Sequence, residues 1–227
     1  MQLTKDQKSI IVKVINCFET GKPQGDYGAI AIFNDGPHNI RQITYGRSQT
    51  TEYGNLRELI QRYTQAAGTY SDQLKPYADQ IGSISLTDDK VFIQLLRDAG
   101  RKDPVMAKIQ DDFFDDRYFK PAMKWADSNG FTLPLSALVI YDSYIHSGSI
   151  LWIIRQKFAE NPPASGGDEK KWITAYVNAR NEWLANHHLD VVRRTTYRTA
   201  TFIQEINKGN WDLSQVPLNA HGIPVTP

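Results

Sequence analysis

Glu19 and Asp35 are the two residues whose type and placement could do chemistry together. Glu19 follows Ile15 by four positions, so it lies on the apolar stripe of a predicted helix. Asp35 lies in a turn sequence, 34–37, between two apolar runs. An acid and a carboxylate that face each other across a groove are the arrangement that cleaves a glycosidic bond. The spacing therefore points to hydrolysis of a sugar polymer.

The helix that must carry Glu19 has a clear beginning and end. Thr4 and Gln7 form a capping box at its start, and Gly21 and Pro23 stop it. Partial burial and the negative end of the helix dipole both favour the protonated form of Glu19. A general acid at neutral pH requires that form. The alternative interpretation is a surface glutamate that happens to close a helix.

The second element is a hairpin that carries Asp35. Residues 29–33 form a short apolar strand, and residues 40–45, which include Thr44, return as its partner. Asp35 taken alone would most often be a plain turn residue, because an Asp-Gly pair suits tight turns. Its pairing with Glu19 favours the catalytic interpretation. Glu52 is the alternative candidate for the base.

Along the chain, a predicted helix that ends in Glu19 is followed by a hairpin with an Asp-Gly turn and then by a Thr-x-Gly sequence. This order resembles that of the lysozyme-like hydrolases. More closely, the chain is similar to the chitosanases of glycoside hydrolase family 46. The further segments that carry this resemblance are Asp116-Arg117-Tyr118-Phe119 with Pro121-Ala122, Tyr141-Asp142 before His146, Gly166-Gly167-Asp168-Glu169 before Ala179-Arg180, and Arg198 before 207–213. Their order along nearly the whole chain is what makes coincidence improbable.

The resemblance implies a mainly α fold of the α+β lysozyme-like class. We expect one domain over residues 1–227 with two helical lobes and a substrate cleft between them. A small β-hairpin sheet should lie in the minor lobe, roughly residues 20–60, with the remainder in the major lobe. The sequence contains about eight apolar stripes with helical spacing and one clear hairpin pattern, which agrees with a mainly helical fold.

The resemblance also implies endo-acting, inverting hydrolysis of β-1,4 bonds in chitosan. Glu19 would be the general acid, Asp35 the general base, and Thr44 would orient the attacking water. Inversion needs the two carboxyl groups ~6.5–9.5 Å apart, against ~5–5.5 Å in a retaining enzyme. We expect the substrate to be bound by Arg41, Tyr45 and Asn55.

Asp142 differs from the surface acids because it lies in a nearly all-apolar predicted helix, 135–145. An unpaired charge there would be costly, and Arg180 and Arg198 on later helices are its natural partners. The resemblance implies an Asp–Arg–Arg network behind the active site at these positions. We interpret it as support for the catalytic residues.

Two departures from the family pattern bear on the substrate. Family chitosanases usually carry an Asp at the position of Asn55, where it helps to hold a glucosamine ammonium. The segment between Asp35 and Thr44 is also longer than usual, with residues 37–40 inside it. Two alternatives therefore stay open: a muramidase-like peptidoglycan hydrolase, and a catalytically silent glycan-binding protein.

Composition excludes some other classes. The formal net charge of +1 over 227 residues provides no strong field for nucleic acid or a membrane surface. The scattered histidines and the single cysteine, Cys17, match no metal-site spacing, so we expect no metal and no cofactor. We expect a monomer that acts on a polysaccharide. The family is generally secreted, and we expect the same here, although the sequence from Met1 shows no signal-peptide pattern.

Overall fold

The structure is a computed structural model that describes residues 1–47 and 49–227. It is mainly helical with small antiparallel sheets, which confirms the predicted fold class. The chain divides into two compact units. The first unit combines Met1–Pro23 with Asp116–Pro227, and the second is Gln24–Asp115, a longer range than the 20–60 expected for the minor lobe.

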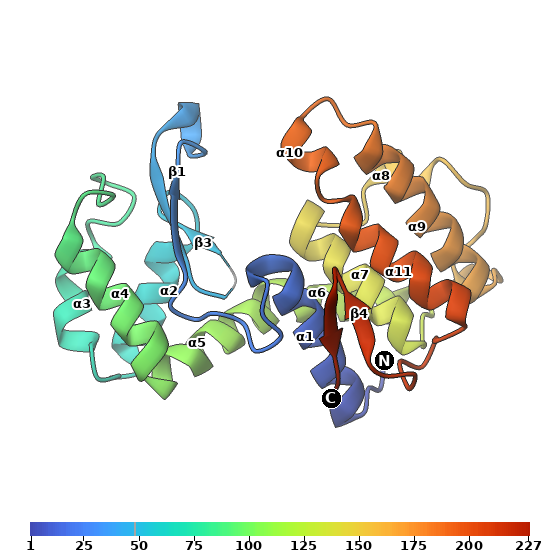
Figure 1. Ribbon diagram of the computed structural model, residues 1–227, viewed down its shortest axis with the longest axis horizontal. Helices are drawn as coiled ribbons and strands as arrows, with labels where there is room; N and C mark the ends of the chain where they lie inside the picture. The colour runs from blue at the N-terminus through green and yellow to red at the C-terminus, as the bar shows by residue number, and fades with distance from the viewer. Residues whose placement is uncertain (48) are drawn as a thin grey trace. The chain divides into compact units, whose positions relative to one another are not determined.

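The second unit holds the predicted hairpin and a set of helices (Figure 1). Its elements are β1 (Ile30–Phe33), a 3-10 turn (Pro37–Asn39), β2 (Gln42–Tyr45), β3 (Thr50–Thr51), α2 (Leu56–Gln65), α3 (Ser71–Ala78), α4 (Lys90–Lys102) and α5 (Pro104–Phe114). A π-helical segment, Asp115–Phe119, follows α5, and the chain leaves the second unit within it.

The three strands form one antiparallel sheet in the order β1-β2-β3. Phe33 pairs with Gln42 at the turn end of the hairpin, and Thr44 lies between Ala31 and Thr51. Side chains alternate between the two faces of a strand, so Ile43 and Tyr45 share one face of β2 and Gln42 and Thr44 the other. Ile43 and Tyr45 are fully buried in a core completed by residues of α2, α3, α4 and α5.

The first unit contains the remaining helices and a second hairpin (Figure 1). Its elements are α1 (Lys5–Thr20), α6 (Lys120–Ser128), α7 (Pro134–Ser147), α8 (Trp152–Arg155), a 3-10 turn (Pro163–Ser165), α9 (Glu169–Ala185), α10 (Asp190–Arg193), α11 (Thr196–Lys208), β4 (Leu218–Ala220) and β5 (Ile223–Val225). None of the helices in the described ranges is long and apolar enough to cross a membrane.

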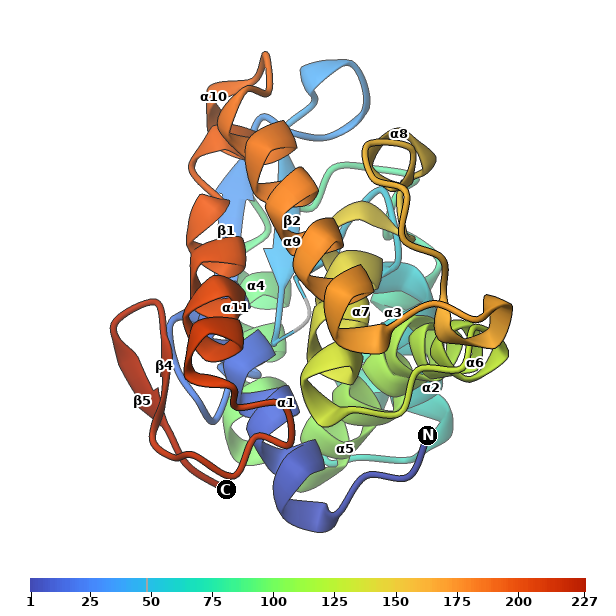
Figure 2. The same cartoon turned by 90° about the vertical axis from the view of Figure 1, so that its right-hand side faces the viewer.

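Helix α7 is the centre of the first unit, since α1, α6, α9 and α11 all pack on it (Figure 2). Ten consecutive residues of α7, from Pro134 to Ser143, are buried, as a helix without a polar face requires. The β4–β5 hairpin packs on α1 and α11, and Lys13 of α1 donates to the carbonyl of Thr226 just after β5. The helix that carries Glu19 is therefore held by α7 and by the C-terminal hairpin.

Candidate active site

Glu19 lies in the last turn of α1, as predicted. The Thr4–Gln7 capping box is present at the start of the helix, and Gly21 ends it in the left-handed conformation with φ 68°. The amide of Gly21 donates to the carbonyl of Cys17 at 3.0 Å, which satisfies one of the last carbonyls of the helix. The stripe Ile11, Val14 and Ile15 is fully buried.

The side chain of Glu19 belongs to a chain of charged groups that crosses four helices. Arg198 of α11 donates from Nη2 to Glu19 Oε1 at 2.5 Å and from Nη1 to Asp142 Oδ1 at 2.7 Å. Arg180 of α9 donates from Nη1 to the other oxygen of Asp142, also at 2.7 Å. The structure therefore brings the three residues of the predicted network together and links that network directly to Glu19.

The network is almost closed to water. The side chains of Asp142 and Arg180 are fully buried, and those of Arg198 and Glu19 are 6% and 12% exposed. Burial opposes the charge of Asp142, but Arg180 and Arg198 hold the pKa of Asp142 below its ordinary value. Burial also opposes the charge of Arg198, and Asp142 and Glu19 raise the pKa of its guanidinium above its ordinary value. The guanidinium of Arg198 thus remains charged beside the acid.

His146 is a titratable group close to this network. It lies near the C-terminal end of α7, one turn after Asp142. Burial lowers its pKa to about 4, and Arg180 and Arg198 add to the effect. His146 is therefore neutral at physiological pH and adds no charge to the network.

The contact with Arg198 is the part of the Glu19 environment that the sequence argument lacked. The sequence argument considered only burial and the helix end, whereas the structure adds a guanidinium that donates directly to one carboxylate oxygen of Glu19.

Aromatic packing fixes the backbone next to Glu19. The Tyr197 hydroxyl donates to the carbonyl of Phe18 at 3.0 Å, and the two rings meet edge to face at 5.6 Å. The guanidinium of Arg198 lies over the Phe18 ring, 5.3 Å from its centre. These contacts hold both partners of the Glu19–Arg198 hydrogen bond against one aromatic cluster.

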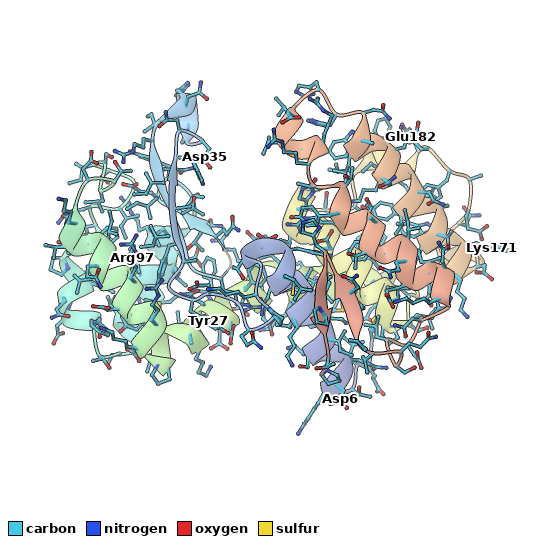
Figure 3. The ribbon with its side chains drawn as sticks, in the orientation of Figure 1. Asp6, Tyr27, Asp35, Arg97, Lys171 and Glu182 are labelled. Carbon is cyan, nitrogen blue, oxygen red and sulfur yellow. The ribbon has the colours of Figure 1, made fainter. Side chains whose placement is uncertain are left out.

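Asp35 lies in the connection between β1 and β2, near the tip of the hairpin (Figure 3). Its side chain is exposed, and its Oδ1 accepts a hydrogen bond from Nε2 of Gln42 at 3.0 Å. Within residues 37–40, Pro37–Asn39 form a 3-10 turn, and the titratable residue of this stretch is His38. The stretch contains no carboxylate that could replace Asp35.

Thr44 is a buried residue in the middle strand of the sheet, on the same face of β2 as Gln42. None of the described residues makes a hydrogen bond with its hydroxyl. Asp35 and Thr44 thus come from one hairpin.

The structure does not place Tyr45 where a sugar could reach it. Its side chain is fully buried in the core of the second unit, and its hydroxyl donates to the carbonyl of Leu96 at 2.8 Å. Burial raises the pKa of its hydroxyl well above the ordinary value. The strand alternation explains the position, since Tyr45 shares the core face with Ile43. We therefore do not retain Tyr45 as a substrate contact.

Arg41 and Asn55 both lie where solvent reaches them. Arg41 donates to Oδ1 of Asp88 at 2.7 Å, and both side chains of this pair are at least half exposed. Asn55 stands at the N-cap position of α2, but its side chain makes no capping hydrogen bond.

The surroundings of Glu52, the alternative base, indicate a role in holding the fold together. It is 1% exposed, and its two oxygens accept from the backbone amides of Ile43 at 3.0 Å and Leu86 at 2.7 Å. These two bonds join β2 to the segment before α4 and engage both carboxylate oxygens. The geometry favours Asp35 over Glu52 as a group that meets water.

Metal chemistry has no residues to support it in the part of the chain that the structure describes. Across residues 1–47 and 49–227, no group of three or more His, Cys, Asp or Glu side chains could hold an ion.

Gln42 is the site residue that sequence reasoning missed. The signal that could have identified it is the alternation in Gln42-Ile43-Thr44-Tyr45, which places a long amide on the same strand face as the Thr44 hydroxyl. Its position next to the Asp-Gly turn would then have suggested a contact with Asp35.

Comparison with known proteins gives a consistent result over most of the chain. Residues 13–218 match the family described as glycosyl hydrolase family 46. A chitosanase from Bacillus subtilis (strain 168) is 29% identical over 225 residues, which cover 92% of this chain and 79% of the relative.

Solved structures agree. The complex of Gynuella sunshinyii GH46 chitosanase GsCsn46A with chitotetraose has a TM-score of 0.81 and 27% identity, covering 99% of this chain and 98% of the other. A mutant chitosanase from Bacillus subtilis MY002 complexed with 6 GlcN has a TM-score of 0.81 and 26% identity, covering 95% and 94% of the two chains.

Proposed function

The chain belongs to glycosyl hydrolase family 46 and is a glycoside hydrolase, and we propose that it cleaves β-1,4 bonds within chitosan chains with inversion. The observation that carries this proposal is the family match over residues 13–218. Two similar structures contain chitotetraose and 6 GlcN, which are short pieces of the proposed polymer.

Glu19 is the general acid in this proposal. It donates its proton to the glycosidic oxygen as the bond to the sugar breaks, and it becomes a carboxylate in doing so. Arg198, 2.5 Å away, stabilises that carboxylate without having to move. Asp142 and Arg180 hold Arg198 in place, so the stabilising charge is fixed before the reaction begins.

Asp35 is the general base. It takes a proton from a water molecule that attacks the opposite face of the sugar ring, and the Thr44 hydroxyl orients that water. A single displacement of this kind leaves room for the water, with carboxyl groups ~6.5–9.5 Å apart. Support for Asp35 comes from its exposure, since a base must meet solvent, and from the buried, fully engaged state of the competing Glu52.

The roles are tested by three substitutions and one stereochemical measurement. Glu19→Gln and Asp35→Asn keep the shape of the side chains, so each should lower kcat by about 10²–10⁴-fold while oligosaccharide binding persists. Thr44→Ala should lower it less, because water can still enter without guidance. NMR of the first product should show the α-anomer, and an initial β-anomer would rule out single displacement.

Peptidoglycan cleavage is the second candidate function, and the presence of Asn55 where relatives usually carry Asp is the observation that favours it. Reducing-end release from chitosan, chitin and peptidoglycan should be measured side by side. We expect chitosan to be cleaved fastest. Robust lysis of peptidoglycan with little chitosan cleavage would select the muramidase function, and binding without cleavage would indicate a silent glycan-binding protein.

The proposal includes extracellular action by a monomer. A long polysaccharide is cut where it occurs, outside the cell, and an endo-acting enzyme needs no second copy to do so. Size-exclusion chromatography with light scattering tests the oligomeric state directly.

A further inference from the structure

Gln42 forms hydrogen bonds with both the proposed base, Asp35, and the backbone of Tyr53. It is the first residue of β2 and is only 5% exposed, although glutamine is normally a surface residue. Its Nε2 donates to Asp35 Oδ1 at 3.0 Å, and its Oε1 accepts from the amide of Tyr53 at 3.4 Å. The amide nitrogen thus faces an acceptor and the amide oxygen faces a donor, so both contacts require the same orientation of the side chain.

Asp35 depends on this contact for its orientation. Its side chain is exposed on a turn, where a carboxylate can otherwise rotate freely. Gln42 is its hydrogen-bond partner among the described residues, and the bond uses Oδ1 only. The second oxygen, Oδ2, is left for water.

We infer that Gln42 is a positioning residue that fixes Asp35 so that Oδ2 is the proton-accepting oxygen. This inference rests on the proposed function, in which Asp35 is the general base. Strand alternation places Gln42 and Thr44 on one face of β2, so a single strand positions both the base and the group that orients the water. In this assignment Gln42 acts through Asp35, to which it donates its hydrogen bond.

The longer turn after Asp35 protects this arrangement. A Cβ at Gly36 would lie 3.3 Å from Gln42 Cδ and 2.7 Å from the carbonyl of Ile40, so only glycine allows the turn to lie this close. The amide of Gly36 donates to that same carbonyl at 2.9 Å and closes the turn on itself. The turn therefore covers the Gln42 amide, and water is kept from competing for it.

The first test separates kcat from KM on glucosamine hexamers. Gln42→Met has nearly the same length but no hydrogen-bonding amide, so we expect kcat to fall 10- to 100-fold with KM changed less than twofold. Gln94→Met is the matched control, because Gln94 donates to Asp98 Oδ1 at 3.1 Å on the exposed face of α4. Its kcat should equal that of the native protein.

A second variant excludes a purely structural role. Gln42→Glu keeps an acceptor for the Tyr53 amide but replaces the donor with a carboxylate that repels Asp35. If Gln42 only held Tyr53, this variant would keep native kcat. We expect instead a loss at least as large as in Gln42→Met, with thermal midpoints measured to show that both variants fold. If the Met variant does not fold, the Glu variant decides alone.

The double variant Asp35→Asn with Gln42→Met completes the design. If Gln42 acts through Asp35, adding its substitution to Asp35→Asn should cause no further loss of the residual rate. Native kcat in both Gln42 variants, with Asp35→Asn inactive, would overturn this inference and leave the proposed function standing. Native kcat in Asp35→Asn would overturn the base assignment and this inference together.

Discussion

Arg198 donates a hydrogen bond from Nη2 to Glu19 Oε1 over 2.5 Å, and the same guanidinium binds Asp142 through Nη1. One planar group therefore connects the proposed acid to the buried centre of the first unit. The geometry uses a property of arginine that lysine lacks, since its nitrogens point in fixed and different directions. The contact gives a direct way to test the role of the network.

Arg198→Lys should separate charge from geometry. A lysine keeps the positive charge but cannot bond both Glu19 and Asp142, so we expect kcat to fall about 10- to 100-fold. The free energy of unfolding should fall by about 1–3 kcal/mol, because Asp142 loses one of its partners while buried. Steady-state kinetics and urea unfolding measure the two effects.

The control for this variant is Arg62→Lys. Arg62 pairs with Glu58 on the surface of α2, and such pairs contribute only about 0.3–0.5 kcal/mol. Native activity in Arg198→Lys would show that the bridge to Glu19 is not needed.

His146 predicts a dependence of stability on pH. Burial, Arg180 and Arg198 lower its pKa from 6.5 to about 4 in the folded state, while Asp142 acts in the opposite direction. The unfolded chain therefore takes up a proton between pH 6.5 and 4 that the folded chain does not. The contribution of neutral His146 is fully present above pH 6.5 and is lost as pH falls toward 4, with a total of about 3 kcal/mol.

The measurement compares native protein with His146→Gln by urea unfolding from pH 7.5 to 4. The native protein should lose more stability than the variant over this interval. NMR titration of the imidazole provides an independent value, and a midpoint near 6.5 would contradict the prediction.

Glu52→Gln should destabilise the second unit without removing catalysis. An amide offers one acceptor where Glu52 uses two, so one of the backbone donors, Ile43 or Leu86, loses its partner. A buried donor left without a partner costs about 1–3 kcal/mol. Thermal unfolding should show this loss, while kcat below the transition stays within a few-fold of native. A folded but inactive variant would restore Glu52 as the base.

Asn55→Asp should raise turnover on highly deacetylated chitosan. A carboxylate balances a glucosamine ammonium as an amide cannot. The exchange should not disturb the fold, because the Asn55 side chain makes no capping bond and a negative charge suits the start of α2. Initial rates on chitosans of graded acetylation measure the effect. An equal change at every degree of acetylation would argue against an ammonium contact.

Much of the first unit could be predicted from sequence because local signals there are strong. The capping box, the apolar stripe and Gly21 specify α1 and the position of Glu19 on it. Asp142 could be placed in a buried helix, and its arginine partners follow from the high cost of an unpaired buried charge. These inferences need only helical periodicity and charge.

The remaining contacts depend on how distant segments pack, which periodicity does not encode. The bond from Arg198 to Glu19 joins residues of α11 and α1, and the bond from Arg41 to Asp88 joins a turn to the start of another helix. The burial of Tyr45 was within reach of sequence reasoning, because Gln42-Ile43-Thr44-Tyr45 alternates and Tyr45 shares a face with Ile43. The prediction that Tyr45 contacts a sugar left this alternation out of account.

The turn after Asp35 has a consequence for how this hairpin can diverge and be engineered. Its ends are already joined by the bond from Gly36 to Ile40, and strand pairing begins outside it, where Phe33 meets Gln42. Residues 37–39 can therefore be lengthened, shortened or exchanged while the strand register is kept, since extra loop length adds little entropic cost. The hairpin thus offers a site for grafting new sequence beside a carboxylate whose own anchor, Gln42, belongs to the strand.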